Sequence, residues 1–234
     1  MSIKAMWIAF FGLFTKEVLR VVRIWPQTLL PSAITMILYF MIFGNLIGNR
    51  IGEMQGFTYV DFIAPGLIMM SIITNSYVNV ASTFFSTKFQ GNIEEMLVST
   101  MSNNSIILGF VVAGVTRGLV IGMFVTIISL FFTTLHIESY FFVFVVAFLT
   151  SVLFALAGLL NGIFAKKFDD VSIIPTFVLT PLTYLGGVFY SIHLLSPFLQ
   201  KLSFFNPILY MVNGFRYSML GFSDVNVGFA LLAE

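Results

Sequence analysis

Cysteine is absent from this 234-residue sequence, and charged residues make up only 9% of it. The absence of cysteine excludes disulfides, thiolate zinc sites and cysteine nucleophiles together. A soluble domain is typically about 25% charged and about 45–50% apolar, whereas 59% of this chain is hydrophobic. Because so few charges cannot cover so much apolar surface in water, the composition predicts an integral membrane protein.

Motifs for catalysis and for energy coupling are also missing. His136 and His193 are far apart, and no His-Glu-x-x-His, Gly-x-Ser-x-Gly or His/carboxylate cluster occurs, so we expect no catalytic, cofactor-binding or metal-binding residues. The phosphate-binding pattern Gly-x4-Gly-Lys-Ser/Thr does not occur either. We interpret Asp169 and Asp170, which follow two lysines, as a solvated turn before a helix. A net charge of +1 does not indicate a nucleic-acid partner.

Five stretches approach the length of about 20 mainly apolar residues that a transmembrane helix needs. They cover residues 29–48, 62–81, 113–135, 139–165 and 171–192, and the third extends back to Ser105 in a longer interpretation. The prolines in or beside these runs are interpreted as simple kinks: Pro31, Pro65, Pro175 and Pro181. The predicted fold class is an all-α membrane protein, a polytopic helical bundle with residues 1–234 in a single domain.

Basic residues in the loops predict the orientation of the bundle. Lysine and arginine are enriched in cytoplasmic loops. Seven lie before the first span or in the loops on that same side, and three lie in the alternate loops: Lys4, Lys16, Arg20, Arg23, Lys88, Lys166 and Lys167 against Arg50, Lys201 and Arg216. We therefore expect a cytoplasmic N-terminus. Arg117, inside the third run, is interpreted as snorkelling to the nearby surface, with a buried pairing role as the alternative.

Residues 5–25 show the pattern of a helix lying in the membrane interface. An apolar stripe recurs at steps of three and four residues, and a basic face follows the same spacing: Trp7, Phe11, Phe14, Val18, Val22 and Trp25 against Lys16, Arg20 and Arg23. This combination suits the headgroup boundary, where tryptophan anchors a helix. The alternative is that the apolar run only extends a buried helix.

The loop region 87–103 predicts a short capped helix at the cytoplasmic surface. Asn92 is the expected N-cap, with Glu95 completing a capping box and Glu94 complementing the helix dipole. The residues expected to share an apolar face are Ile93, Met96, Leu97, Thr100 and Met101. Such a face either docks into a partner or lies back on the bundle, and composition does not separate these alternatives.

Three segments in this order resemble the membrane subunits of ABC-2 type transporters. Asn92-Ile93-Glu94-Glu95-Met96-Leu97-Val98-Ser99-Thr100 is similar to the ATPase-coupling helix of that family. Pro181 to Tyr190 resembles its Pro…Gly-Val-Phe signature, and Asn206 to Arg216 its Asn-Pro…Tyr…Arg segment. The resemblance assigns ATPase coupling to Gly91, Asn92, Ile93, Glu94, Glu95, Met96, Leu97 and Thr100. It assigns the family motif to Pro181, Gly187, Phe189, Asn206, Pro207, Tyr210 and Arg216.

The resemblance implies an inner-membrane permease of bacteria, without an ATPase site of its own. Family members have six spans and two cytoplasmic termini, so we expect a sixth span that this sequence lacks. Residues 193–217 are expected to re-enter the outer leaflet. The implied partners are a second permease subunit, in a homodimer, membrane lipids, and a separate ATP-binding cassette ATPase that binds ATP and Mg²⁺. The implied cargo is a drug, lipid or glycan, exported outward. The alternatives are a secondary transporter or channel, a membrane-embedded enzyme and a structural anchor.

Overall fold

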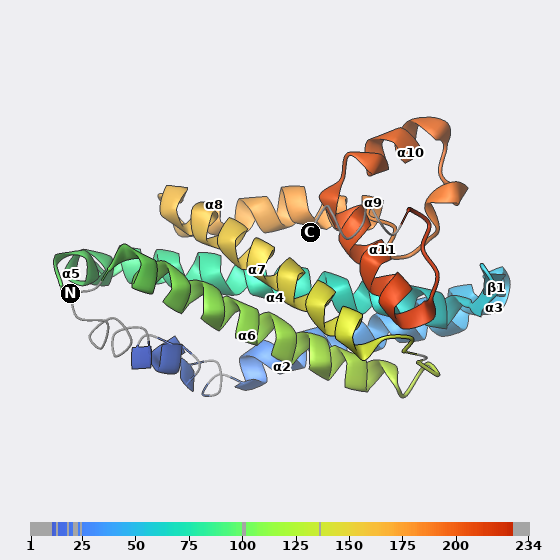
Figure 1. Cartoon of the computed structure of the whole chain (residues 1–234), viewed down its shortest axis with the longest axis horizontal. Coiled ribbons are helices and arrows are strands. Elements are labelled where there is room, and N and C mark those ends of the chain that lie inside the picture. Colours follow the sequence, from blue (N-terminus) through green and yellow to red (C-terminus); the bar gives the residue numbers. More distant parts are fainter. Residues whose placement is uncertain are drawn as a thin grey trace.

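The computed structural model describes residues 11–12, 14–17, 19–20, 23, 25–99, 102–135 and 137–226. In these ranges the chain forms a bundle of long helices with several short helices packed near one end (Figure 1). Among the described residues, four helices are long and apolar enough to cross a membrane: Trp25–Gly44, Tyr59–Phe89, Asn103–Ser129 and Tyr140–Phe164. The all-α membrane class is confirmed.

The chain runs through the bundle in a simple order. The first half contains α2 (Trp25–Tyr39), the π-helix η1 (Phe40–Ile47), α3 (Gly48–Ile51), β1 (Glu53–Met54), β2 (Phe57–Thr58), α4 (Tyr59–Phe89) and α5 (Asn92–Val98). The second half contains α6 (Asn103–Ser129), α7 (Tyr140–Phe164), α8 (Phe168–Ile174), the π-helix η2 (Pro175–Leu179), α9 (Thr180–Leu185), the 3-10 helix η3 (Ile192–Leu194), α10 (Pro197–Phe204) and α11 (Pro207–Leu220).

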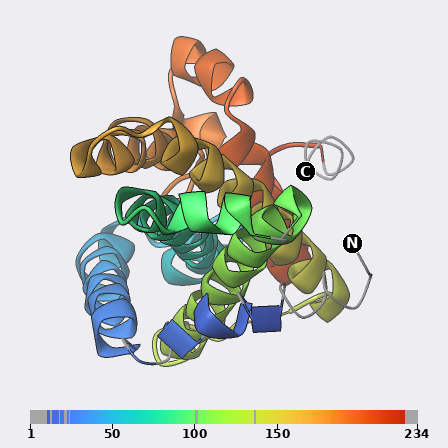
Figure 2. The same ribbon diagram turned by 90° about the vertical axis from the view of Figure 1, so that its left-hand side faces the viewer.

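The central helix is α4, which is buried between α6 and α7, while α2 lies at the edge of the bundle (Figure 2). Glycines on the neighbouring helices allow backbones to meet closely. A Cβ added at Gly158 of α7 would lie 2.3 Å from the carbonyl oxygen of Tyr77, and one at Gly118 of α6 would lie 1.8 Å from the Ser76 hydroxyl. The close packing fixes the side chains that α6 and α7 present to α4.

Two long helices extend beyond their predicted bounds because hydroxyl side chains cap them outside the apolar runs. The Thr58 hydroxyl accepts a hydrogen bond from the backbone N–H of Asp61 (3.3 Å), so α4 starts before residue 62. The Ser102 hydroxyl accepts one from the N–H of Ser105 (3.2 Å), so α6 begins at Asn103, close to the longer interpretation that reached Ser105 and ahead of the start at 113. That helix ends at Ser129 instead of 135.

The predicted fifth span, 171–192, was wrong at its end. Helical structure runs through α8, η2 and α9 but stops at Leu185, and it is not among the four helices long and apolar enough to cross a membrane. The turn that follows contains Gly187 with φ of 72°, a left-handed conformation that favours glycine. The apolar run therefore continues past the point at which the backbone leaves the helix.

The N-terminal segment is helical where the structure describes it, and it lies beside the bundle (Figure 1). Of the predicted apolar stripe, Phe11 and Trp25 are exposed, while Trp7, Val18 and Val22 lie outside the described residues. The Arg20 guanidinium donates a hydrogen bond to the Thr83 hydroxyl of α4 (2.8 Å). The segment is thus attached to α4 near the α5 end.

Candidate functional site

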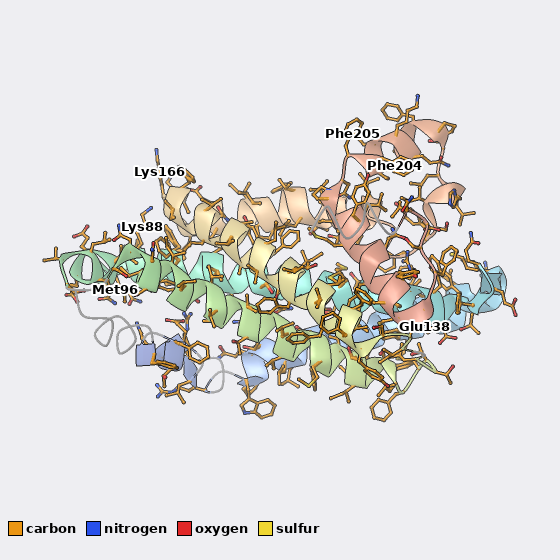
Figure 3. All side chains as sticks on the ribbon, viewed as in Figure 1. Lys88, Met96, Glu138, Lys166, Phe204 and Phe205 are labelled. Carbon is orange, nitrogen blue, oxygen red and sulfur yellow. The ribbon has the colours of Figure 1, made fainter. Side chains whose placement is uncertain are left out.

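The short helix α5 lies at one extreme of the bundle, across the connection from α4 to α6 (Figures 1 and 2). Lys88, Met96 and Lys166 gather at this end, whereas Glu138 lies at the opposite end (Figure 3). The predicted coupling residues 91–97 therefore lie together in α5 and at its N-cap, at the surface of this end of the bundle. Thr100, the last predicted coupling residue, and Met101 lie outside the described residues.

Gly91, rather than Asn92, is the N-cap of α5, which corrects the predicted cap by one residue. Gly91 has φ of 77°, and its carbonyl oxygen accepts a hydrogen bond from the Glu94 N–H (3.1 Å). The sharp turn after α4 needs this left-handed backbone, which glycine adopts without steric cost. Glu94 and Glu95 are in the first turn of α5, where carboxylates complement the helix dipole.

The apolar residues of α5 are divided between two faces. Ile93 and Met96 pack against a small core of α4, α6 and α7 that includes Phe110. Leu97 is 57% exposed and Val98 is 89% exposed. One face of α5 therefore lies back on the bundle, as one alternative predicted, and the other is exposed; docking of the exposed face into a partner stays a prediction.

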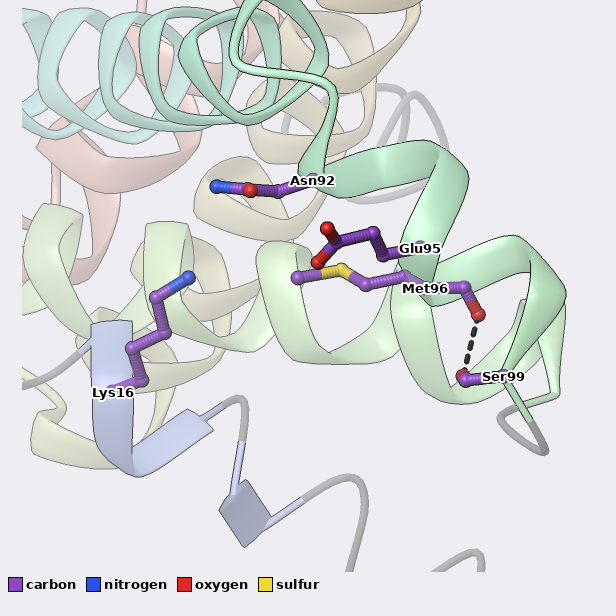
Figure 4. A pocket seen from close by; sticks show the side chains of 5 residues that line it. All are labelled: Lys16, Asn92, Glu95, Met96 and Ser99. Atoms are coloured by element: carbon purple, nitrogen blue, oxygen red, sulfur yellow. Dashed lines mark hydrogen bonds between the residues drawn. The ribbon is translucent and has the colours of Figure 1, made fainter.

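A polar pocket of about 300 Å³ lies between α5 and the N-terminal segment. Lys16 approaches it from the N-terminal segment, opposite Asn92 and Glu95 of α5 (Figure 4). At its far side the Ser99 hydroxyl donates a hydrogen bond to the carbonyl oxygen of Met96 (2.6 Å) and closes the end of the helix. The N-terminal segment and α5 thus form one continuous surface.

Lys88 connects the α5 turn to the end of α7. Its ammonium donates hydrogen bonds to the carbonyl oxygens of Ile163 (2.7 Å) and Ala165 (2.9 Å). A lysine at these orphan carbonyls satisfies them and complements the negative end of the helix dipole. The ring of Phe168 in α8 packs edge-on against two rings of α4, with 4.9 Å between ring centres to Phe85 and 5.0 Å to Phe89. The end of α4 that leads into α5 is therefore joined to the end of α7 through Lys88 and to α8 through Phe168.

Asp170 organises the neighbouring turn into α8. The backbone N–H groups of Lys166 (2.8 Å) and Lys167 (3.0 Å) donate hydrogen bonds to its carboxylate and hold the pKa of Asp170 below its ordinary value. This agrees with the predicted role of Asp169 and Asp170 in a turn that starts a helix. Across the same turn, the Asn161 amide donates to the carbonyl oxygen of Val171 (3.1 Å).

Arg216 is the centre of a second group of contacts, near the end of the bundle opposite α5. Its guanidinium is fully buried and donates to the carbonyl oxygens of Gly187 (2.7 Å) and Phe62 (3.3 Å). The guanidinium also lies 4.0 Å from the centre of the Phe62 ring and 3.8 Å from the carboxylate of Asp224. The Asp224 carboxylate accepts from the Ser191 hydroxyl (2.7 Å). One side chain thereby joins α4, the turn after α9, α11 and the segment beyond it.

The other motif residues make contacts of their own in α9, the turn after it and α11. Asn206 caps α11 by accepting from the N–H of Ile208 (3.0 Å) and also donates to the carbonyl oxygen of Leu182 (2.6 Å). Pro207 begins α11, and the Tyr210 hydroxyl donates to the carbonyl of Phe204. The ring of Phe189 stacks on that of Phe43, with 4.7 Å between the ring centres. Pro181 lies near the start of α9. The two motifs are therefore brought together, which their sequence order alone did not predict.

Several contacts were not found from the sequence. Asp224 is the one carboxylate that pairs with Arg216 in the described structure. The sequence offered one hint of this pair, because Asp224 lies only eight residues after Arg216 in a segment with few charges. Arg117 donates to the Asn79 amide oxygen of α4 (2.8 Å), which agrees with the buried pairing alternative rather than with snorkelling. In the described ranges, no group of three or more His, Cys, Asp or Glu side chains is placed to hold a metal ion.

Residues 8–220 match the family model described as "ABC-2 type transporter". The chain is 62% identical over 219 residues to "Inner membrane transport permease YadH" of Escherichia coli, covering 94% of this chain and 86% of that protein. It is 26% identical over 200 residues to "Nodulation protein J" of Neorhizobium galegae, covering 85% and 76% respectively. It is 24% identical over 192 residues to "Nodulation protein J" of Rhizobium leguminosarum bv. viciae, covering 82% and 74%.

Proposed function

This chain belongs to the ABC-2 type transporter family, and on that basis we propose that it exports an amphipathic drug, lipid or glycan-like substrate, using ATP hydrolysed by a separate subunit. It is a multi-pass transport permease of the inner membrane, and membership of the family implies association with an ATPase subunit. ATP and Mg²⁺ belong to that partner in this proposal, because the chain has no phosphate-binding loop of its own.

The observation that carries the proposal is the position of α5 at the end of a helix that is longer than the bilayer core is thick. With 31 residues, α4 is about 46 Å long, whereas the hydrocarbon is about 30 Å thick, so an upright α4 projects from the hydrocarbon. Arg20 contacts Thr83, about 9 Å along α4 from its end at Phe89. If the N-terminal segment lies at the interface, α5 stands clear of the lipid and can enter the cleft of a partner.

The same end of the bundle supports a cytoplasmic orientation. Lys88 lies in the last turn of α4, and Lys166 and Lys167 lie between α7 and α8 at the same end, which agrees with the enrichment of cations on the cytoplasmic side. We therefore place the N-terminus and α5 in the cytoplasm, where ATP is available. Closure of the ATPase would push α5, and Lys88 would transmit the movement to α7.

A groove of about 240 Å³ between α2 and α4 supports an amphipathic cargo. It combines the apolar Met36 and Met70 with side chains that carry hydroxyl or amide groups: Ser32, Thr35, Tyr39, Ser71, Thr74 and Asn75. Ser71 and Ser32 donate to carbonyl oxygens of their own helices, which leaves their lone pairs able to accept hydrogen bonds from sugar or headgroup hydroxyls. A second copy of the permease would close this open edge of the bundle and complete the pathway.

Substitutions in α5 test the proposal in vesicles that contain the chain and its ATPase. Leu97→Glu alters the exposed face, and Gly91→Glu forces a side chain onto a backbone at φ of 77°. We expect each variant to reduce transport about tenfold or more while ATP hydrolysis continues. Phe164→Glu is the matched control, because Phe164 is also an exposed apolar residue near this end. Unchanged transport in both α5 variants would contradict the proposal.

The same vesicles distinguish the main alternative. A secondary transporter or channel would move its cargo without the ATPase, driven by an ion gradient or by the cargo gradient alone. We expect no transport by the purified chain under either gradient, because the driving force comes from ATP hydrolysis.

A further inference from the structure

Two arginines from different elements contact one face of α4, apart from the α5 turn and from the contacts of Arg216. Arg20 of the N-terminal segment donates to the Thr83 hydroxyl, and Arg117 of α6 donates to the Asn79 amide oxygen, each at 2.8 Å. Asn79 and Thr83 are four residues apart, which places them one above the other on the helix. The two guanidinium groups are therefore neighbours, and their positive charges repel each other.

Negative charge at this place is insufficient for two arginines. Among the described residues the one carboxylate paired with either of them is Glu17, whose oxygen lies 3.7 Å from Arg20. Burial raises the pKa of Glu17, which weakens its ability to balance the cations. Both hydrogen-bond acceptors on α4 are neutral groups. The local charge of this pair is thus positive.

Arg117 also has unused hydrogen-bonding capacity. Its Nε atom is buried and has no hydrogen-bond partner in the described part of the chain. A buried donor without a partner costs about 1–3 kcal/mol, and more when it is charged. Native structures therefore satisfy such groups with an ion, a water molecule or a ligand. An arginine fork with a free edge suits the oxygens of a phosphate in particular.

The surroundings indicate where such a phosphate would come from. The side chain of Arg20 is 43% exposed, so the pair can be reached from outside the bundle. Three residues after Arg117, α6 presents the exposed apolar side chain of Val120, and the exposed Met123 follows about one turn further along. Leu19 is exposed beside Arg20. Cations with exposed apolar side chains beside them match a molecule that has an anionic head and hydrocarbon chains.

We propose that Arg20 and Arg117 bind the phosphate of an anionic phospholipid in the leaflet that the N-terminal segment faces. The phosphate oxygens accept hydrogen bonds from both guanidinium groups, and the acyl chains lie along the exposed face of α6. Because the arginines belong to the N-terminal segment and to α6 and both contact α4, the bound lipid joins three elements. This site does not depend on the cargo or on the transport direction proposed above.

Lipid binding to the purified full-length chain tests this proposal. Native mass spectrometry in a neutral detergent measures retention of phosphatidylglycerol against phosphatidylcholine, and thermal unfolding measures the stabilisation by each. Inorganic phosphate at the same concentration separates a free anion from a headgroup. We expect selective retention of phosphatidylglycerol and a higher unfolding midpoint with it, but no such shift with inorganic phosphate.

The variants Arg20→Gln and Arg117→Gln should each weaken phosphatidylglycerol binding about tenfold. Arg23→Gln, which removes an exposed cation from the same segment, is the matched control and should bind as the unmodified chain does. If Arg117→Gln does not fold, the Arg20→Gln variant, at a partly exposed side chain, tests the proposal by itself. Equal phosphatidylglycerol retention in the arginine variants and the control would overturn the proposal. A full effect of inorganic phosphate alone would also overturn it, because the site would then take a free anion.

Discussion

Arg216 is the residue on which the end opposite α5 most depends. Its guanidinium satisfies carbonyl oxygens of Phe62 and Gly187 and faces the carboxylate of Asp224 in a fully buried position. Lysine at this position would keep the charge but would lose the planar fork that reaches separate acceptors. Buried charges of this kind stabilise a structure only while every partner is present.

Arg216→Met should lower the free energy of unfolding by about 3–5 kcal/mol, because it leaves the Asp224 carboxylate buried without its cation. Arg216→Lys should lie between this variant and the unmodified chain. Unfolding of the detergent-solubilised protein measures the effect. Lys201→Met removes an exposed cation from α10 and serves as the control. A loss no larger than that of the control would show that the buried cluster does not stabilise the fold.

Asp170 gives a pH-dependent prediction. Hydrogen bonds from the backbone N–H groups of Lys166 and Lys167 lower the pKa of Asp170, so its contribution to stability is fully present at neutral pH. That contribution is lost as the pH falls below the ordinary value of about 3.9 and through the lowered pKa. Asp170→Asn should unfold at a lower temperature at pH 7, and the difference should disappear in strong acid.

The neighbouring carboxylate provides the comparison for this titration. Asp169→Asn removes a charge from the same turn and leaves both backbone hydrogen bonds to Asp170 in place. Its effect should be smaller at pH 7. Equal effects of the two variants at every pH would mean that the charge of the turn matters and the hydrogen bonds to Asp170 do not.

At the scale of helices, the packing of α7 on α4 depends on Gly158. A Cβ at this position would lie 2.3 Å from the Tyr77 carbonyl oxygen, which belongs to the backbone and cannot rotate away. Gly158→Ala should therefore separate the two helices and destabilise the bundle by about 1–3 kcal/mol. Thermal unfolding measures this loss. Leu156→Ala, at an exposed position of the same helix, should change the midpoint little, and equal losses in both would contradict the account.

The sequence predicted the helices better than their ends. Hydropathy placed the middles of the four long helices, because lipid selects continuous apolar runs. Caps decide the boundaries, and Ser102 lies well outside the apolar run that it extends. The turn at Gly187 ends α9, although the residues after it remain apolar. Caps and turn residues of this kind therefore decide where a helix begins or ends, even where the apolar run continues.

The candidate site was predicted in part for a similar reason. A short surface helix was predicted within residues 87–103 because capping and periodicity are local signals, and it forms as Asn92–Val98 with its N-cap at Gly91 rather than at Asn92. The contacts of Arg216 with Phe62 and Gly187 join residues that are 154 and 29 positions apart, and no local pattern encodes such pairs. Lys88 at the end of α7 was assigned only to a loop, since its acceptors lie 75 and 77 positions away.

In the whole molecule, the α5 turn and the contacts of Arg216 lie at opposite ends of the same central helix, α4. The α5 turn follows the last residue of α4, and Phe62, a partner of Arg216, lies in its first turn. The length of α4 separates the α5 surface, which is proposed to receive force from the ATPase, from the buried cluster around Arg216. Movement between them must pass along the closely packed α4, α6 and α7, which favours rigid displacement over local bending.

The most direct test of the central claim is cross-linking from α5 in the assembled, transporting complex. The chain has no cysteine, so Leu97→Cys introduces a single reactive position, and Phe131→Cys introduces one at the exposed opposite end of α6. We predict that position 97 cross-links to the ATPase subunit, that the cross-link stops transport, and that position 131 gives none. A complex that transports normally with position 97 unreactive towards the ATPase, or one that cross-links through position 131, would contradict the account.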